Sequence, residues 1–418
     1  MRVVPLVLFA TLLGASDLLA GQTREDNWNR CKGSDPDLSI GGCTALIQSG
    51  QENDSNMARA FRNRGIAYDD KGEYDRAIQD YDQSIRLDPN FADAFSSRGS
   101  AYDDKGDYDH ALQDYAQALR LKPNYEDAYV NRGVTYRKMG KYDLAIQDYD
   151  QTIRLEPTDA VAFLDRGVAY DDKGDLDHSE QNYDHAMQDY DQALRLNPSY
   201  ANAYNDRGNL YLTKRDYDHA IQDLDQAIRL NPRLEVAYRN RGLANRRKGD
   251  VDHAIQDFSD ALRLNPNDAT AYNNRGYAYD TRGDYERAMA DFSQVISLRP
   301  SNAAAFNSRC WDRAIVGQLQ LALEDCNKSL ALIPNDADTL DSRGFAYLKL
   351  KNPDAAINDY NAALAVSPKM ASSLYGRGLA EQIKGDQAAA SKDIAAAKAI
   401  QANIADQFAK LGIPATNP

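Results

Sequence analysis

Residues 92–125 read ADAFSSRGSAYDDKGDYDHALQDYAQALRLKPNY, and this stretch decides the fold. Its pattern recurs with variation from Ala58 almost to the C-terminus, mostly at a spacing of 34 residues. A fixed period of roughly 20 to 50 residues is typical of architectures in which each unit packs only on its neighbours. We therefore expect a solenoid of repeated units, with a core that is buried between neighbouring units.

The residues of one repeat predict two helices. We number the repeat from Ala92 as position 1. Large apolar residues at positions 4 and 11 (Phe95 and Tyr102) flank a small residue at position 8, and positions 20, 24, 27 and 28 continue with the same helical spacing. Gly106 is typical of a helix end, and Pro123 cannot continue a second helix. Each repeat should be a helix, a tight turn and a second, antiparallel helix.

The order of residues within the repeat resembles the tetratricopeptide repeat family. An aromatic residue at position 4, Gly at 8, Tyr at 11, Ala at 20, an aromatic residue at 24, Ala at 27 and Pro at 32 carry the resemblance, which covers residues 58 to about 404. It implies an all-α fold, a right-handed superhelical solenoid of helix pairs with a concave groove. It also implies a protein that binds peptides or proteins in that groove and has no catalytic activity.

The repeat frame divides the chain. We expect a signal peptide at 1–20, an N-terminal cap at 21–57 and a C-terminal cap and tail at 405–418. The ten repeats between them are 58–91, 92–125, 126–159, 160–200 with a seven-residue insertion, 201–234, 235–268, 269–302, 303–336, 337–370 and 371–404.

The first twenty residues predict export. Arg2 precedes an apolar run from Val3 to Leu13, and small residues follow up to Ala20, as in a secretory signal peptide. The run is short for a membrane span. An uncleaved N-terminal anchor is the alternative, and it would be the only membrane contact. Export would place the protein in the periplasm or outside the cell, where disulfides form.

The four cysteines predict two disulfides. Cys310 and Cys326 occupy positions 8 and 24 of one repeat, which the hairpin brings face to face in place of the usual glycine and aromatic residue. Cys31 and Cys43 would form the second bond and fix the N-terminal cap. The alternative is four free, buried thiols.

Composition and motifs exclude several classes of function. The chain has 49 Lys and Arg against 63 Asp and Glu, a net charge of −14, whereas a nucleic-acid partner needs a basic face. No nucleophile elbow, zinc-protease motif, phosphate-binding glycine loop or CxxC occurs, so we expect no enzyme, no small-molecule substrate and no cofactor. The five histidines are scattered and should face solvent, and acidic pairs such as Asp69-Asp70 lack the order of a calcium loop. We therefore expect no metal site and interpret the acidic pairs as a solvated rim.

Two further patterns give structural predictions. Position 7 is arginine and position 23 is aspartate in all ten repeats, which predicts a structural Arg–Asp contact within or between repeats, with a ligand site as the alternative. Between Gly167 and Ala186 the residues 176–179 and 183–186 are related by a seven-residue duplication. This predicts that the second helix of that repeat begins two turns early and projects about 10 Å beyond its neighbours. A disordered loop is the alternative.

The resemblance also implies where a ligand would bind. Positions 2, 5, 9, 12 and 13 of the first helix line the family's groove. In repeats 5 to 8 they include Asn202, Asn205, Asn209, Arg239, Arg246, Arg247, Asn273 and Asn307. Asparagine suits the backbone of an extended peptide, and arginine suits a carboxylate, so we expect an extended, acidic peptide segment of an envelope protein at this site. The alternatives are that these side chains only solvate the groove, or that the protein is a structural or assembly subunit of an envelope or secretion complex that uses its convex or terminal surfaces.

Overall fold

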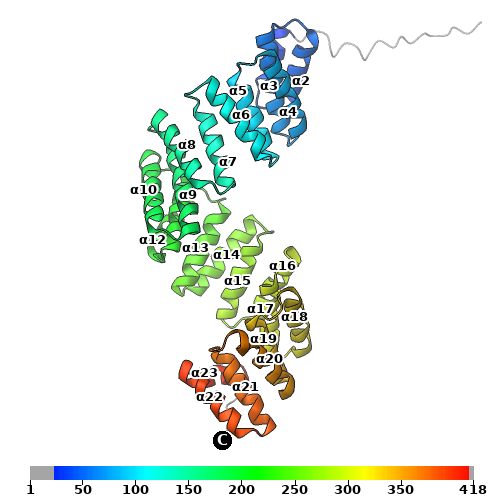
Figure 1. Cartoon of the computed structure of the whole chain (residues 1–418), viewed down its shortest axis with the longest axis vertical. Coiled ribbons are helices and arrows are strands. Elements are labelled where there is room, and N and C mark those ends of the chain that lie inside the picture. Colours follow the sequence, from blue (N-terminus) through cyan, green and yellow to red (C-terminus); the bar gives the residue numbers. More distant parts are fainter. Residues whose placement is uncertain (1–22, 414–418) are drawn as a thin grey trace, which may run out of the picture. The chain divides into compact units, whose positions relative to one another are not determined.

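A computed structural model describes residues 23–413 of the 418-residue chain. This range contains 23 α-helices joined by short turns, and no β-strand (Figure 1). The expected signal peptide at 1–20 lies outside the described residues, as does the end of the expected tail. The chain divides into two compact units between Pro198 and Ser199, and each unit is described by itself.

The first unit consists of consecutive helix pairs, in which each helix packs on the next one along the chain. Its helices are α1 (Arg24–Cys31), α2 (Pro36–Ser49), α3 (Asp54–Asp69), α4 (Tyr74–Leu87), α5 (Ala92–Asp104), α6 (Tyr108–Leu121), α7 (Glu126–Lys138), α8 (Tyr142–Leu155), α9 (Ala160–Asp177) and α10 (Glu180–Leu196).

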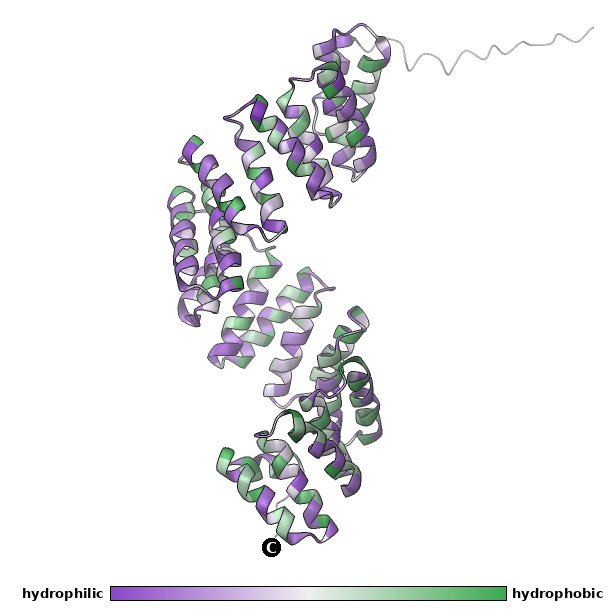
Figure 2. Ribbon diagram, viewed as in Figure 1, coloured by the Kyte–Doolittle hydropathy of each residue, from purple (hydrophilic) through white to green (hydrophobic). Residues whose placement is uncertain are grey.

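The second unit continues the pattern and ends in a short additional helix. Its helices are α11 (Ala201–Thr213), α12 (Tyr217–Leu230), α13 (Glu235–Lys248), α14 (Val251–Leu264), α15 (Ala269–Thr281), α16 (Tyr285–Leu298), α17 (Ala303–Ile315), α18 (Leu319–Leu332), α19 (Ala337–Lys349), α20 (Pro353–Val366), α21 (Ala371–Lys384), α22 (Gln387–Ile400) and α23 (Ile404–Lys410). Figure 2 shows hydrophilic and hydrophobic residues side by side along the helices of both units, as expected for helices that bury one face. The predicted all-α repeat fold is therefore confirmed.

Glycine and aspartate produce the turn within a repeat. After α5, Gly106 has a φ of 84°, and no other atom lies within 4 Å of the position that a Cβ would take. Glycine suits this left-handed backbone because it has no Cβ to clash. Asp107 then caps α6, since its side chain accepts a hydrogen bond from the backbone N–H of His110 at 3.3 Å.

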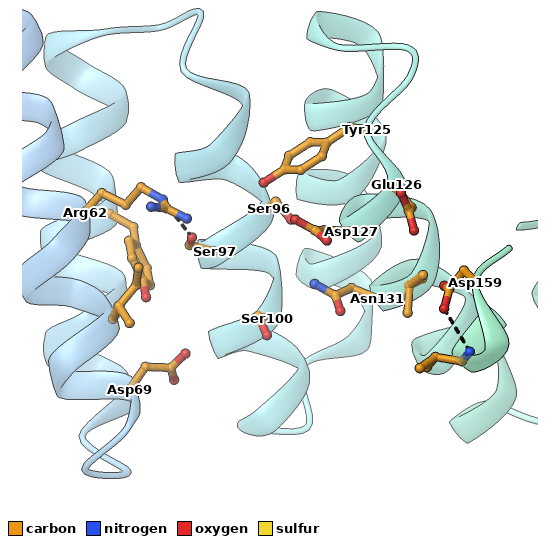
Figure 3. Close-up of a pocket in the computed structure, with 14 residues that line it drawn as sticks. Arg62, Asp69, Ser96, Ser97, Ser100, Tyr125, Glu126, Asp127, Asn131 and Asp159 are labelled. Atoms are coloured by element: carbon orange, nitrogen blue, oxygen red, sulfur yellow. Dashed lines mark hydrogen bonds between the residues drawn. The ribbon is translucent and has the colours of Figure 1, made fainter. Parts of the chain in front are cut away.

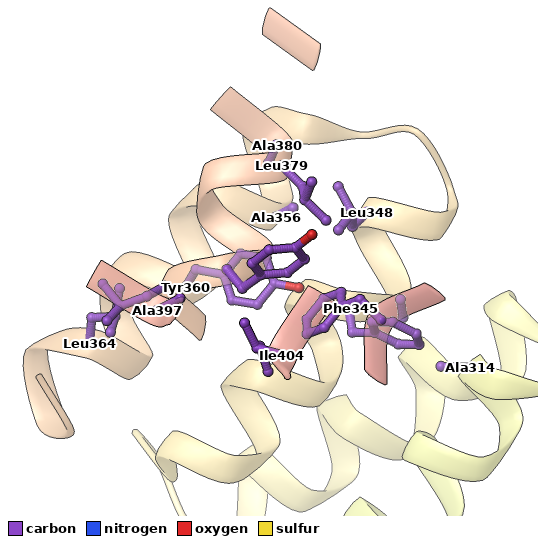
Figure 4. Packing of buried hydrophobic residues seen from close by; sticks show 14 of the residues in the cluster. Ala314, Phe345, Leu348, Ala356, Tyr360, Leu364, Leu379, Ala380, Ala397 and Ile404 are labelled. Carbon is purple, nitrogen blue, oxygen red and sulfur yellow. The ribbon is translucent and has the colours of Figure 1, made fainter. Parts of the chain in front are cut away.

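The two helices of a repeat approach most closely at the glycine of position 8. A Cβ on Gly99 would lie 2.9 Å from Cε1 of Tyr115, so any larger residue would force the helices apart. Gly344 faces Tyr360 in the same way in the second unit, and Tyr360 belongs to the buried cluster drawn in Figure 4. The large-on-small pairing of positions 8 and 24 thus sets the spacing of the hairpin.

The repeated Arg–Asp contact is present in all ten repeats. Arg98 shows its geometry, because Nε and Nη2 donate to the two carboxylate oxygens of Asp114 at 2.8 and 2.7 Å. Nη1 of the same arginine donates to Asp82 of the preceding repeat at 2.5 Å. One side chain therefore joins the two helices of its own repeat and also fixes the register between neighbouring repeats.

Both predicted disulfides are present. Cys31 and Cys43 join α1 to α2, and Cys310 and Cys326 join α17 to α18, with S–S distances of 2.00 and 2.01 Å. All four sulfurs are thus paired. Within residues 23–413, no helix is long and apolar enough to cross a membrane.

The prediction for the seven-residue insertion was wrong in one respect. The inserted residues are helical, but both helices share them: α9 has 18 residues and α10 has 17, against 13 and 14 in α5 and α6. A Cβ on Gly174 would lie 2.7 Å from Tyr183, which repeats the contact of Gly167 with Tyr190 one level further out. The second glycine–tyrosine level moves the turn to His178, so each helix gains about one turn, roughly 5 Å.

Candidate functional site

The predicted ligand residues lie on the first helices of the repeats of the second unit. We call the surface formed by α11, α13, α15, α17, α19 and α21 the first-helix face of this unit. The structure separates the eight predicted residues into three groups, according to whether their polar atoms already have partners.

Two of the eight residues are occupied by contacts within the protein. Nη1 of Arg239 lies 2.6 Å from Asp268, whose carboxylate also caps α15. Asn205 is buried, donates to Asp206 at 2.9 Å and accepts from Asn240 at 3.2 Å. The repeat pattern suggested both as ligand contacts because it could not show these partners within the protein.

Three residues, Asn202, Asn209 and Arg247, are exposed. The remaining three, Arg246, Asn273 and Asn307, are half-buried and lie on three successive repeats. Nε of Arg246, Oδ1 of Asn273 and Oδ1 of Asn307 are each out of solvent, and among the described residues none has a hydrogen-bond partner. A buried polar group without a partner costs about 1–3 kcal/mol, so these three atoms are available for a ligand to satisfy.

Arg246 also has an unusual environment for an arginine. Burial, followed by the positive charge of Arg247, lowers the pKa of its guanidinium group. Its guanidinium carbon lies 5.9 Å from the centre of the Tyr277 ring, and among the described residues it forms no salt bridge. Among these contacts, only the face of the Tyr277 ring stabilises the positive charge of Arg246.

A pocket of about 430 Å³ opens beside Asn307 on the same face. Aromatic side chains that line it are Tyr277, Trp311 and Phe408, and acidic side chains that line it are Asp280, Asp338 and Asp341. The residues come from α15, α17, α19, α21 and α23, so four successive repeats and the final helix build one pocket. The sequence reasoning missed this pocket, although Trp311 at position 9 of a first helix was a signal for it.

The final helix closes one side of the pocket. Phe408 of α23 packs edge-on against Phe345 and Tyr375, with ring centres 5.9 and 4.8 Å apart. Nζ of Lys349 donates to the backbone oxygen of Leu411 at 3.3 Å and anchors the end of this helix. Figure 4 shows Ile404, at the start of α23, beside Phe345 in the buried cluster. The C-terminal segment thus packs on the buried cluster and also forms a wall of the pocket.

The repeat pattern and this architecture agree with comparisons to known sequences. Family models described as TPR repeat match residues 99–140 and 174–215, and models described as Tetratricopeptide repeat match 58–91, 126–159, 201–234, 239–303 and 343–403. The chain belongs to the tetratricopeptide repeat family. Tetratricopeptide repeat proteins are generally non-enzymatic scaffolds that bind protein or peptide partners. No curated protein sequence matches the whole chain or a part of it.

Solved structures with a similar fold share little sequence. One is a tetratricopeptide repeat protein from Parabacteroides merdae, with 22% identity over 61% of this chain and 98% of that chain and a TM-score of 0.45. Another is PilF of Pseudomonas aeruginosa, with 20% identity, 51% and 94% of the two chains covered and a TM-score of 0.46. A third is YrrB, described as having an unusual peptide-binding site, with 20% identity, 45% and 97% covered and a TM-score of 0.42.

The carboxyl groups at the pocket of this tetratricopeptide repeat protein are poorly compensated. Burial raises the pKa of both Asp280 and Asp312. The charge of Asp280 and a hydrogen bond between the two carboxyl groups raise the pKa of Asp312 further, whereas the same hydrogen bond lowers the pKa of Asp280. Asp312 is fully buried, and among the described residues its carboxyl oxygens have no hydrogen-bond partner other than the carboxyl group of Asp280. Burial raises the pKa of Asp341 to about 6, and the charge of Asp338 adds to the effect.

The first unit has a different pocket on its own first helices, of about 540 Å³. Figure 3 shows Arg62 hydrogen-bonded to Ser97 on one side, with Asp69 and Asp127 among the residues around the pocket. Burial, followed by the charges of neighbouring aspartates, raises the pKa of Asp69 to about 6.

The first members of the acidic pairs are not fully solvated. Asp103 is 9% exposed, accepts a hydrogen bond from Thr135 and forms a salt bridge with Lys138. The interpretation of the acidic pairs as a solvated rim is therefore wrong for their first members, which turn into the repeat interface.

The histidines lie apart from one another and mostly contact aspartates on the surface. His110, His219 and His253 are exposed and contact an aspartate three residues earlier, whereas His185 is half-buried against the ring of Tyr170, contrary to expectation. Across residues 23–413, no group of three or more His, Cys, Asp or Glu side chains has the geometry to hold a metal ion.

Proposed function

We propose that this protein binds an extended segment of another polypeptide on the first-helix face of its second unit. The observation that carries the proposal is the row of unpartnered polar atoms on Arg246, Asn273 and Asn307. Asparagine oxygens at equivalent positions of successive repeats suit the backbone N–H groups of an extended chain. The half-buried guanidinium of Arg246 suits a carboxylate of that chain.

We narrow the proposed site to fewer residues than the sequence suggested. Arg239 and Asn205 support neighbouring repeats through their internal contacts, so we assign the ligand contacts to Arg246, Asn273 and Asn307, with Asn209 and Arg247 at the exposed margin. We infer that the protein resides in an oxidising compartment, the periplasm or outside the cell, because all four of its cysteines form disulfides.

The proposal can be tested with a library of immobilised peptides and the protein without its first 20 residues. The double variant Asn273→Ala with Asn307→Ala should bind selected peptides at least about ten-fold more weakly, because two hydrogen bonds are lost. Gln222→Ala with Asn358→Ala removes two exposed amides from second helices and is the matched control.

The two variants distinguish the candidate functions. Equal binding by the asparagine variant and its control would refute the peptide site. A stable complex with a whole protein that survives both double substitutions would instead support the assembly-subunit alternative, with a partner on another surface.

A further inference from the structure

We propose that the pocket between α15, α17, α19, α21 and α23 accepts a basic side chain, lysine or arginine, of the bound polypeptide. The inference rests on the proposed function and adds the chemistry of one anchoring residue. Four carboxyl groups carry it, Asp280, Asp338 and Asp341 in the lining and Asp312 behind it, together with the aromatic rings that share the pocket.

The first step is that the four carboxyl groups have no cationic partner within the described residues, although Asp341 accepts a hydrogen bond from Ser373 at 2.5 Å and Asp280 is hydrogen-bonded to Asp312. Among the described residues none of the four forms a salt bridge with a lysine or an arginine. In the same repeats, every aspartate at position 23 is held by an arginine through two hydrogen bonds. Arginine compensates these position-23 carboxylates, so the carboxyl groups beside the open pocket, which no cation of the described residues compensates, point to an external cation.

The second step is that two cations of the protein, Lys349 and Arg246, contact residues that line the pocket, but both are engaged elsewhere. Lys349 donates to the backbone oxygens of Ile315 and Leu411 at 2.8 and 3.3 Å. Arg246 lies against the ring of Tyr277 and bonds to none of the four carboxyl groups. No rearrangement of these two residues is needed for the pocket to receive a positive charge from outside.

The third step identifies the kind of cation. The carboxyl groups are too dispersed for a metal, since residues 23–413 contain no cluster of three ligands that could hold one. Tyr277, Trp311 and Phe408 line the same space, and aromatic faces attract ammonium and guanidinium groups. A volume of about 430 Å³ has room for a lysine or arginine side chain and leaves the pocket open for the rest of its chain.

The fourth step connects the cation to a polypeptide. Asn307 lines the pocket, and its Oδ1 is one of the unpartnered buried oxygens of the peptide site. A chain whose backbone N–H reaches this oxygen has an adjacent side chain at the entrance to the acidic pocket. The same ligand would therefore satisfy Asn307 and the carboxyl groups together.

Fluorescence of Trp311 provides a direct test. The chain has two tryptophans, so Trp28→Phe leaves Trp311 as the only reporter. The probes are the peptide Gly-Asn-Gly-Lys-Gly-Asn-Gly, the same peptide with Nε-acetyl-lysine, the same peptide with norleucine, and free 1,5-diaminopentane. We expect the lysine peptide to change the fluorescence and to bind at least ten-fold more tightly than either neutral peptide, with a preference that declines as salt is added.

Substitutions separate this inference from the proposed function. Asp280→Asn with Asp338→Asn should remove the preference for lysine and leave the affinity of the norleucine peptide unchanged, whereas Asn273→Ala should weaken all the peptides by a similar factor. Asp69→Asn with Asp104→Asn, in the first unit, is the matched control and should change neither.

Each contrary outcome has one meaning. Equal affinity for the lysine and neutral peptides overturns the cation pocket and leaves the peptide site standing. Tight binding of 1,5-diaminopentane without binding of any peptide overturns the polypeptide as occupant and counts against the proposed function as well. Lysine preference that persists in the Asp280 and Asp338 variant overturns the assignment of these residues.

Discussion

Asp257→Asn tests whether the repeated Arg–Asp pair holds the solenoid together. Asp257 accepts from Nε and Nη2 of Arg241 and from Nδ2 of Asn245, and its side chain is only 4% exposed. Arg241 is 23% exposed and also donates from Nη1 to Asp225 of the preceding repeat at 2.6 Å. The substitution replaces one carboxylate oxygen with an amide nitrogen and leaves the shape of the side chain unchanged.

The expected loss follows from burial. Breaking a buried ion pair on one side costs about 3–5 kcal/mol, because the remaining charge stays desolvated. Arg241 keeps some contact with water and keeps Asp225, so we expect about 2–3 kcal/mol of lost stability. Asp225→Asn is the matched control in the same ion-pair network. The side chain of Asp225 is 42% exposed, and exposed pairs are worth about 0–1 kcal/mol.

Urea unfolding followed by far-ultraviolet circular dichroism measures both variants, and hydrogen exchange of α13 and α14 localises the loss. Local measurement matters because repeat proteins can unfold in parts, so a single midpoint can hide the change. If Asp225→Asn lowers the free energy of unfolding as much as Asp257→Asn does, the contact of Arg241 within its repeat is not the more stabilising of its two ion pairs. That result would refute the reasoning.

Three other expectations follow from the described contacts. Replacing Cys310 and Cys326 by alanine should lower the free energy of unfolding by about 3 kcal/mol, because the disulfide joins residues that are 16 positions apart in the sequence. The analogous change at Cys31 and Cys43 should reduce protection from hydrogen exchange only near α1 and α2. The folded protein raises the pKa of Asp312, so Asp312 stays protonated at pH values at which the unfolded chain, with a pKa of about 4, has released this proton. The free energy of unfolding should therefore fall as the pH rises from about 4 toward the raised pKa. Asp312→Asn should raise the urea midpoint more at pH 8 than at pH 4, and an equal gain at both pH values would contradict the assignment. In the repeat with the insertion, the amides of α9 and α10 between Tyr170 and Asp177 and between Tyr183 and Tyr190 should exchange slowly, and rapid exchange in either helix would contradict the shared extension.

The sequence predicted those features that depend on one repeat alone. The disulfide of Cys310 and Cys326 and the Arg–Asp pair both join positions that a hairpin must bring together, so a single repeat with its turn suffices to find them. The insertion shows where this reasoning is incomplete. The duplicated residues at 183–186 directed attention to the second helix, but Gly174 and Tyr183 form an additional packing level, which requires both helices to lengthen.

The candidate site was harder to predict because its contacts cross repeats. Arg239 occupied a groove position of the family, yet its carboxylate partner, Asp268, is the residue that caps the next first helix. The pocket needs Asp280, Trp311 and Asp338 from three repeats together with Phe408 from the final helix. A list of positions within one repeat cannot show which side chains of different repeats are paired and which are left without a partner.

The ten repeated Arg–Asp pairs help to locate function, because they show which carboxyl groups the fold itself pairs and which it does not. In a repeat protein, a structural requirement recurs in every unit, as the ten Arg–Asp pairs do. The buried carboxyl of Asp312, by contrast, occupies a position that holds threonine in Thr135, where the hydroxyl donates to the neighbouring Asp103 and leaves no carboxyl pair. Because the fold is satisfied elsewhere by a hydroxyl at this position, a second carboxyl group here is not required by the architecture, and we attribute the pair of Asp280 and Asp312 to what the pocket beside it binds.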